Sequence, residues 1–389
     1  MKKKENILFV AHTSGLNGAE RSLCDVLRYL DKNAYSVFVC CPSGDSGRFI
    51  ELVSKIDDVH LSVFPYRWTL ADRNSLSKKI LLFLWQFIAV WPIIFLILKK
   101  NISIICTNTV TVGVGAIAAK ILRKKHIWWV RESLKAGNVG FYIFGEKLYE
   151  KFINLFSDLV IFNSNWTMLE YEFILSIKKK VVYNGFAFKE AIRVKVNQIR
   201  KERGKNKSIL LGVAGKISQH KGQLDAVYVL NELVSSGIDA SLNLYGSIGD
   251  QDYAKKITEL CTSLDCKNRV TLVGFENRRE IVYSNIDILL VPSYVEPFGR
   301  VVVEGMYYGC VVIAAPIGGM NEIISNGVNG FLVDFKRTSV VVSIIKRLLN
   351  DKIELKNIIK NAMLEVDKYS IDRTLNQFQA LLKTQHEGI

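Results

Sequence analysis

The sequence contains no C-x-x-C pair, no zinc-finger spacing and no aromatic RNA-binding signature. Its cysteines are odd in number, and several lie in apolar runs, which indicates buried, reduced thiols rather than a disulfide framework. It also has no tandem repeat of solenoid length and no low-complexity tract, so a repeat protein and a disordered chain are excluded. Because no nucleic-acid motif is present, we expect no nucleic-acid partner.

The charge is unevenly distributed along the 389 residues. Lysine and arginine outnumber aspartate and glutamate by 29 to 16 in residues 1–200, but only by 23 to 21 in residues 201–389. Such one-sided positive charge suits an anionic membrane surface or a phosphorylated acceptor. A chain of this length is too long for one ordinary core and indicates two domains.

Apolar strand candidates alternate with helix candidates throughout the chain, beginning with Ile7–Ala11, which is too short for a signal peptide. The alternation predicts an α/β fold in which helices cover both faces of parallel sheets. The charged segment 189–208 has no clear helical period. We therefore interpret this segment as a linker or surface excursion and place the domain boundary between about 185 and 208.

The segment Ile80–Leu98 carries no charge and is bracketed by the lysine pairs 78–79 and 99–100. It approaches the length of a membrane span, but spanning would put strands of one sheet on opposite sides of the membrane. An ordinary helix packed on a sheet should have one polar face, and this segment has almost none. We therefore expect a helix that packs on one side and contacts an anionic membrane surface on the other.

The run Pro292–Gly309 is the most informative part of the chain. It follows the apolar segment Ile286–Val291, which predicts a buried parallel strand, and a helical pattern begins near Arg300. Glu296 then lies in the strand-to-helix turn and Glu304 in the second helical turn. Since the free amides at a helix start favour an anion, the run suits a ligand with sugar hydroxyls at one end and phosphate in its middle.

Two further glycine-containing loops follow predicted strands. In the loop Ser14–Arg21, Gly15 permits close approach of the backbone to a ligand. In the loop Gly212–Gly222, Lys216 and Lys221 could both reach one diphosphate as point charges. Neither loop is a G-x-G-x-x-G motif, so a plain loop and solvated lysines remain alternatives.

With these motifs the chain resembles glycosyltransferase family 4, the group 1 transferases. The Glu–seven residues–Glu element with an internal Phe-Gly is highly specific for this family. The resemblance implies a GT-B fold, in which two Rossmann-like domains face each other across a cleft. The motifs that carry it are Gly15–Arg21, Asn163-Ser164, Tyr183–Gly185, Gly215-Lys216, Lys221-Gly222, Gly274-Phe275, Pro292-Ser293, Glu296–Glu304, Gly318–Glu322 and Gly327–Gly330.

The resemblance also implies a division of the chain. Residues 1–188 would form the acceptor-side domain, and residues 189–366 would form the domain that binds the nucleotide sugar. Residues 367–389 would supply a helix that packs back onto the first domain.

The resemblance assigns roles to the motif residues. Glu304 would hold the ribose hydroxyls and Glu296 the hydroxyls of the transferred sugar, while Lys216 and Lys221 would neutralise the leaving diphosphate. We thus expect Glu296 and the two lysines to be the catalytic residues, with a UDP- or GDP-sugar as substrate, no cofactor and no metal. The family usually has arginine where Lys216 stands. Further donor contacts are expected from Gly15, Gly215, Phe298, Gly299 and Arg300.

The chain departs from the family in its first half. Many relatives carry a histidine after the strand that corresponds to His126–Val130, whereas this chain has Arg131 and Glu132. We expect these two residues, together with His12 and Asn17, to line the acceptor cleft. The alternatives are a structural ion pair at the strand end and a structural role for His12.

Together these features predict a retaining, hexosyltransferase-type enzyme on the cytoplasmic face of the membrane. It would transfer a sugar from a nucleotide donor to a growing glycan, such as one linked to polyprenyl diphosphate, in cell-surface polysaccharide synthesis. Two rivals are a nucleotide-sugar epimerase on the same fold and a non-enzymatic membrane scaffold with a vestigial sugar site.

Overall fold

The computed structural model describes residues 4–44, 46–67, 70–71, 76–133, 141–142, 145–203 and 208–384. The chain forms two compact units. The first comprises Met1–Ala187 and Ser370–Ile389, and the second comprises Phe188–Tyr369. The chain therefore enters the second unit after Ala187 and returns to the first at Ser370.

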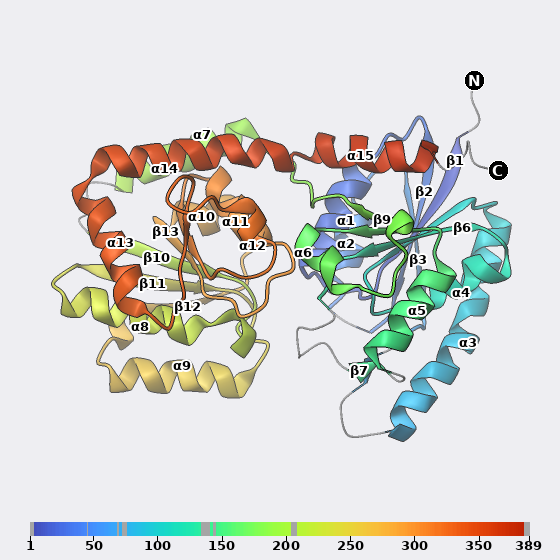
Figure 1. The fold of residues 1–389 in the computed structure, drawn as a ribbon, viewed down its shortest axis with the longest axis horizontal. Coiled ribbons are helices and arrows are strands. Elements are labelled where there is room, and N and C mark those ends of the chain that lie inside the picture. Colours follow the sequence, from blue (N-terminus) through green and yellow to red (C-terminus); the bar gives the residue numbers. More distant parts are fainter. Residues whose placement is uncertain are drawn as a thin grey trace. The chain divides into compact units, whose positions relative to one another are not determined.

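The first unit is built on a parallel sheet with the strand order β3-β2-β1-β5-β6-β8-β9 (Figure 1). The strand order reverses at β1, which lies between β2 and β5. Ligands of open α/β sheets bind at such a switch point, beyond the carboxyl ends of the strands. The strands are β1 (Glu5–Val10), β2 (Tyr35–Pro42), β3 (Val59–Phe64), β5 (Ile104–Asn108), β6 (Lys125–Val130), β8 (Leu159–Phe162) and β9 (Lys179–Val181), beside a short antiparallel pair, β4 (Leu70–Ala71) and β7 (Phe141–Tyr142).

Helices cover both faces of this sheet because side chains of a buried strand alternate between faces. In β1, Ile7 and Phe9 join one apolar cluster, whereas Leu8 and Val10 join another. The first cluster includes residues of α1 (Gly18–Tyr29), α2 (Arg48–Val53) and α15 (Ile371–Thr384). The opposite face is covered by α3 (Leu76–Lys99), α4 (Val114–Ile121) and α5 (Glu146–Phe156), while α6 (Asn165–Glu170) follows β8.

The helix α15 shows how the end of the chain belongs to the first unit. Its Phe378 is fully buried and stacks on Trp129 of β6 at 4.9 Å between ring centroids. At the start of the helix, Ile371 N donates a hydrogen bond to Phe186 O. Gly185 lies so close to α15 that a Cβ there would approach the Ile371 Cα to 2.8 Å.

The second unit has a parallel sheet with the strand order β12-β11-β10-β13-β14-β15. Its switch point lies at β10, between β11 and β13. The strands are β10 (Ile209–Ala214), β11 (Ala240–Tyr245), β12 (Val270–Gly274), β13 (Ile288–Val291), β14 (Val311–Ala314) and β15 (Phe331–Leu332). The helices are α7 (Glu190–Arg203), α8 (Gln223–Ser235), α9 (Gln251–Ser263), α10 (Arg279–Ser284), α11 (Arg300–Tyr307), α12 (Met320–Ile323), α13 (Thr338–Asn350) and α14 (Lys352–Glu365).

The segment predicted to be a linker is a helix, α7, and this expectation was wrong for residues 190–203. The helix is strongly charged, so the sequence shows no apolar stripe. It is anchored instead by the buried Val196 and by Arg200, whose NH2 donates to the carbonyl oxygens of Tyr283 and Ile286 at 2.7 and 2.6 Å. Such an arginine anchor leaves no trace in hydrophobic periodicity.

The helix α3 includes the whole uncharged segment, Ile80–Leu98, that was predicted to contact lipid. The side chains of residues 80–84, 86 and 87 lie outside the described residues. From residue 88 onward one face is buried, and Trp85 Nε1 donates to Pro65 O at 2.9 Å. Within the part of the chain that the structure describes, no helix is long and apolar enough to cross a membrane.

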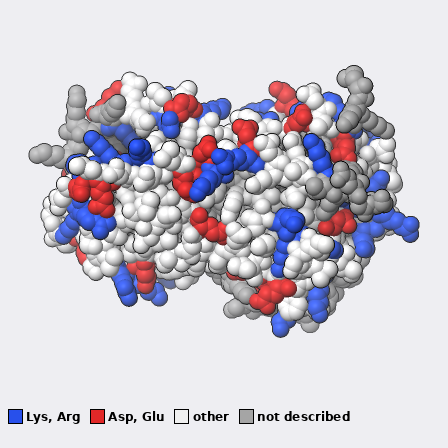
Figure 2. Space-filling view, turned by 45° about the horizontal axis from the view of Figure 1, so that its top comes forward, with Lys and Arg blue, Asp and Glu red and all other residues white. Residues whose placement is uncertain are grey.

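All seven cysteines are buried free thiols, as their positions in apolar runs predicted. Burial raises the pKa of Cys106 to about 12, which keeps this thiol protonated. On the face shown in Figure 2, lysine and arginine side chains are interspersed with acidic ones. The excess positive charge is therefore not gathered into one continuous patch on this face.

Candidate active site

A loop that follows β10 brings two lysines to the switch point of the second sheet. The chain leaves the strand through Gly215, whose N donates to Tyr245 O at 2.8 Å, and reaches Lys216, which is exposed. After one 3-10 turn, Gly222 adopts a φ of +67° and packs against the end of β13. A Cβ at Gly222 would lie 2.1 Å from Pro292 O, so glycine is required for Lys221 to approach this strand end.

Glu296, in the turn after β13, lies against Lys221. Lys221 Nζ is 2.5 Å from Glu296 Oε2, and the exposed fractions of the two side chains are 22% and 14%. The backbone of Glu296 is fixed from the other side by a turn at Gly318. A Cβ added at Gly318 would lie 1.9 Å from Glu296 O, so this turn approaches Glu296 closely. Glu296 O also accepts a hydrogen bond from Gly319 N at 3.1 Å. Two glycine turns thus position the predicted catalytic pair from opposite sides.

The helix α11 begins directly after this turn. Gly299, its N-cap, has a φ of +100°, and no side chain caps the first amides. The start of α11 thus has no side-chain cap, and a helix N-terminus is a position that attracts an anion. Phe298, expected to contact the donor, is 2% exposed and packs edge-on against Tyr369, so its side chain belongs to the core.

Glu304, one helical turn after Arg300, is held by three side chains. Its Oε1 lies 3.3 Å from both Arg300 NH2 and Arg279 Nε, and Tyr283 donates a 2.8 Å hydrogen bond to Oε2. Burial, followed by the charge of Glu304, holds the pKa of Tyr283 well above its usual range, so the hydroxyl stays a donor. Gly305 lets the helix approach the sheet, because a Cβ there would lie 2.5 Å from Leu289 Cδ2.

The carboxyl edge of the first sheet holds a second set of predicted residues. His12 follows β1 and is 5% exposed, and its Nδ1 lies 2.7 Å from Oε1 of Glu20, which is fully buried. Gly15 is buried in the same loop and donates from its backbone N to Thr13 Oγ1 at 3.0 Å. Asn17 is exposed at the N-cap of α1 and makes no side-chain cap.

Arg131 and Glu132, at the end of β6, are held by different partners. The Arg131 Nε donates to Asn108 Oδ1 at 2.6 Å, its NH1 donates to Asn184 Oδ1, and the guanidinium stacks over Trp129. Glu132 Oε2 accepts hydrogen bonds from backbone amides, including that of Val110 at 3.2 Å. Burial raises the pKa of Glu132, although His12 opposes this shift. The predicted alternative, an ion pair between Arg131 and Glu132, does not describe these contacts.

The sequence matches two family descriptions that together cover both units. Residues 195–364 match "Glycosyl transferases group 1", and residues 16–188 match "Glycosyltransferase Family 4". The chain belongs to the family 4, group 1 glycosyltransferases. The Glu296–Glu304 element lies at the carboxyl edge of the second sheet.

Individual relatives match this glycosyltransferase over different lengths. An uncharacterized glycosyltransferase, MJ1607, of Methanocaldococcus jannaschii is 30% identical over 50% of this chain and 51% of its own length. The chain thus spans about half the length of this relative. The capsular polysaccharide biosynthesis glycosyltransferase CapM of Staphylococcus aureus is 24% identical over 77% of this chain and 78% of its own. The structure of Anabaena Alr3699/HepE in complex with UDP-glucose has a TM-score of 0.79 and 24% identity, over 97% of this chain and 99% of that one. This likeness confirms the GT-B fold.

Two residues of the candidate site were missed from the sequence. Arg279 and Tyr283, both in α10, hold Glu304 but lie outside every motif that carried the resemblance. A doubled arginine at the start of a helix that follows the Gly274-Phe275 loop was the available signal for Arg279. Nothing in the local pattern distinguishes Tyr283 from an ordinary core tyrosine.

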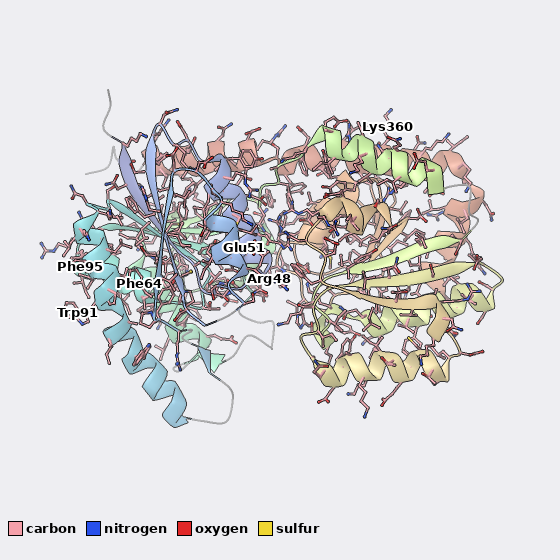
Figure 3. The ribbon with its side chains drawn as sticks, turned by 180° about the vertical axis from the view of Figure 1, so that it is seen from behind. Arg48, Glu51, Phe64, Trp91, Phe95 and Lys360 are labelled. Carbon is pink, nitrogen blue, oxygen red and sulfur yellow. The ribbon has the colours of Figure 1, made fainter. Side chains whose placement is uncertain are left out.

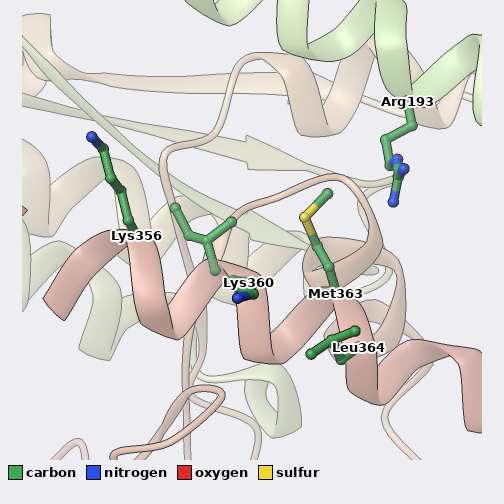
Figure 4. A pocket seen from close by; sticks show the side chains of 6 residues that line it. Arg193, Lys356, Lys360, Met363 and Leu364 are labelled. Carbon is green, nitrogen blue, oxygen red and sulfur yellow. The ribbon is translucent and has the colours of Figure 1, made fainter. Parts of the chain in front are cut away.

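A separate hollow lies on the second unit between α7 and α14 (Figure 4). None of the predicted site residues lines it. Among the residues that the structure describes, no group of three or more His, Cys, Asp or Glu could hold a metal ion. The hollow is lined by Arg193, Lys356, Ile359, Lys360, Met363 and Leu364.

Proposed function

We propose that the chain is a retaining glycosyltransferase that transfers a sugar from a nucleotide-sugar donor to a growing glycan. One observation carries the proposal: Lys216, Lys221, Glu296 and Glu304 all follow the carboxyl ends of β10 or β13, at the switch point of the second sheet, and Lys221 pairs with Glu296. This arrangement offers positive charge for a diphosphate beside carboxylates for hydroxyls. Glu304 would hold the ribose, and Glu296 the transferred sugar.

The proposed reaction proceeds on one face of the sugar. The bond between the anomeric carbon and the diphosphate oxygen breaks while the acceptor oxygen bonds to the same carbon from the same side. The acceptor hydroxyl gives its proton to the departing phosphate. Lys216 and Lys221 stabilise the negative charge that develops on the leaving group. We propose that these lysines meet the need for positive charge without a bound metal.

The relatives support a donor and an acceptor class. The complex of Anabaena Alr3699/HepE with UDP-glucose supports a UDP-sugar as the first donor to try, with a GDP-sugar as the alternative. The capsular polysaccharide role printed for the Staphylococcus aureus relative supports a glycan acceptor in cell-surface synthesis. We propose that the acceptor is linked to a lipid, such as polyprenyl diphosphate.

The outer face of α3 supports a lipid-linked acceptor and a place on the cytoplasmic membrane surface. Between Ile88 and Leu98, apolar side chains spaced three or four residues apart are more than half exposed. Trp91 and Phe95 project from this outer side (Figure 3). Lys99 and Lys100 follow at the end of the helix, where they suit anionic headgroups. The exposed apolar set is Ile88, Trp91, Phe95 and Leu98.

Nucleotide release tests the proposal against its rivals. The full chain is incubated with candidate UDP- and GDP-sugars, selected by thermal shift because a bound ligand raises the melting temperature. Release that requires a lipid-linked glycan supports transfer, and the anomeric configuration of the product tests retention. Isomerised nucleotide sugar without acceptor would support the epimerase, and absence of donor binding would support the scaffold.

A further inference from the structure

We propose that Glu296 also acts as a competitor of the diphosphate for Lys221, so that the site binds the sugar-bearing donor in preference to the nucleoside diphosphate that remains after transfer. The inference rests on the proposed function, because it assumes a nucleotide-sugar donor. It gives the Lys221–Glu296 pair a role in donor selection and product release.

The pair is close and largely shielded from solvent. The Lys221 Nζ and Glu296 Oε2 atoms are 2.5 Å apart, and less than a quarter of either side chain is exposed. Because screening by water is reduced at such a position, the attraction exceeds that of an exposed pair. A diphosphate that binds Lys221 must therefore displace the carboxylate or accept a negative charge beside it.

Lys216, the other predicted phosphate ligand, is not held by a carboxylate in this way. Lys216 is exposed, and no carboxylate is seen paired with it among the described residues. Its side chain crosses Gly249, where a Cβ would lie 2.2 Å from Lys216 Cε. Of the two predicted phosphate ligands, one is thus available to an anion in this structure, and the other is already bound to the sugar-site carboxylate.

The exchange requires only side-chain rotation. Glycine turns fix the backbone on both sides, with Gly222 against Pro292 O and Gly318 against Glu296 O. The loop is tied further by a hydrogen bond from Tyr294 N to His220 O at 2.9 Å. Since neither backbone segment must move, the pair can separate and re-form around a ligand without refolding of a loop.

The donor and the nucleoside diphosphate product differ in the partners that they offer to Lys221 and Glu296 once this ion pair is broken. With the donor bound, the diphosphate takes Lys221 while the sugar hydroxyls donate to Glu296, so both charged groups keep partners. With the nucleoside diphosphate alone, Glu296 loses Lys221 and gains nothing, and its charge lies near the phosphates. The carboxylate therefore favours the donor over the product and promotes release once the sugar has gone.

Calorimetric titration of the full chain with UDP and with GDP tests this exchange. Glu296→Gln keeps the shape of the side chain and removes its charge. We expect the variant to bind the nucleoside diphosphate about tenfold more tightly than the wild type, while its affinity for the matching nucleotide sugar does not improve. The gain should shrink as salt rises.

Asp239→Asn is the matched control. Asp239 precedes β11, at the opposite edge of the sheet, and pairs with Arg269 at 2.6 Å. Its neutralisation changes the net charge equally, so we expect an affinity within about twofold of the wild type. If the control gained the same affinity for the nucleoside diphosphate, the effect of Glu296→Gln would be explained by net charge alone, and the proposed exchange would be overturned.

Combining Glu296→Gln with a lysine substitution tests whether the gain in affinity depends on Lys221. In Lys221→Met, the added substitution Glu296→Gln should no longer produce the full tightening, whereas in Lys216→Met it should persist. Circular dichroism and melting temperature establish that each variant is folded. Wild-type binding of UDP or GDP without tightening in Glu296→Gln overturns the exchange alone. Absence of nucleotide binding in the wild type and in every variant overturns both the donor assignment and the exchange.

Discussion

The two sheets share one topological plan but carry charge differently at their carboxyl edges. In the second unit, Lys221 and Glu296 are partly exposed and paired in a way that a ligand can replace. In the first unit, Glu20 is fully buried, and Arg131 is only 6% exposed and held by two asparagines and a tryptophan ring. We call the carboxyl edge of the second sheet the exchangeable edge, because a ligand can replace one partner of its ion pair. We call the carboxyl edge of the first sheet the fixed edge, because its buried charges keep their protein partners.

This difference separates binding from stability. Charges that exchange partners contribute to ligand selection, whereas charges that are buried with fixed partners contribute mainly to the folded state. All six tryptophans lie between residues 68 and 166, within the first unit. Tryptophan fluorescence therefore reports on the fixed edge, and nucleotide binding reports on the exchangeable one.

The largest effect is expected at the exchangeable edge. We predict that Glu296→Ala lowers turnover by about 10³-fold or more, because the carboxylate that positions the transferred sugar is lost. The melting temperature should remain close to that of the wild type. Glu276→Ala, which removes a carboxylate paired with the exposed Arg278, is the control. Wild-type turnover in Glu296→Ala would contradict the assignment of the second sheet as the donor site.

A different response is expected at the fixed edge. We predict that Arg131→Lys lowers the free energy of unfolding of the first unit by about 3 kcal/mol. Lysine keeps the charge but cannot reach Asn108 and Asn184 together or stack on Trp129 as a planar group. Urea unfolding followed by tryptophan fluorescence measures the change.

Arg269→Lys supplies the comparison for this variant. Arg269 belongs to an exposed pair with Asp239 in the second unit, and we expect a change of less than about 1 kcal/mol there. Because that unit has no tryptophan, its unfolding is followed by circular dichroism. Equal losses in both variants would remove the distinction between fixed and exposed arginines.

The sequence was sufficient for the backbone plan and insufficient for these pairings. Alternating apolar segments predicted both parallel sheets. The apolar segment Ile286–Val291 and the helical pattern from Arg300 predicted a strand-to-helix turn followed by a helix, as the structure shows. These features are local, so their pattern lies within a few residues of the chain. The contact between Lys221 and Glu296 joins residues 75 positions apart, and only the strand order brings them together.

Glu20 illustrates the same limit in the first unit. The pattern Asn17–Glu20 at the start of α1 is that of a capping box, in which the glutamate would reach back to the N-cap amide. Instead its carboxylate lies against His12, because the end of β1 comes close to the first turn of the helix. The local sequence pattern thus assigns Glu20 to a helix cap, whereas in the folded chain Glu20 contacts the buried His12.

The first unit should also show a smaller effect of acid, at the buried His126 near the amino end of β6. Burial lowers the pKa of His126 to about 3, while an unfolded histidine titrates near 6.5. Below that value the unfolded chain binds a proton that the folded chain does not, so stability falls as the pH decreases toward 3. Between pH 6 and 5, we expect the wild type to lose about 1 kcal/mol more than His126→Gln. Parallel curves from fluorescence-monitored unfolding would contradict this.

The smallest change in the free energy of unfolding is expected from substitutions on the outer face of α3. We predict that Trp91→Glu with Phe95→Glu releases the protein from vesicles that contain anionic lipid, because two exposed apolar contacts become repulsive charges. These side chains are 64% and 65% exposed, so the free energy of unfolding should change by less than about 0.5 kcal/mol. Co-sedimentation measures binding, and nucleoside diphosphate affinity should be unchanged.

The control for lipid contact carries the same added charge on the other unit. Ile353→Glu with Tyr228→Glu alters two residues that are 75% and 47% exposed in the second unit. Loss of vesicle binding in the α3 variant alone assigns the lipid contact to the first unit. Equal loss in both variants would show an effect of net charge, and unchanged binding in both would contradict the lipid contact of α3. A first unit that binds the membrane surface through α3, while the second unit exchanges nucleotide, would give each unit one part in the proposed reaction.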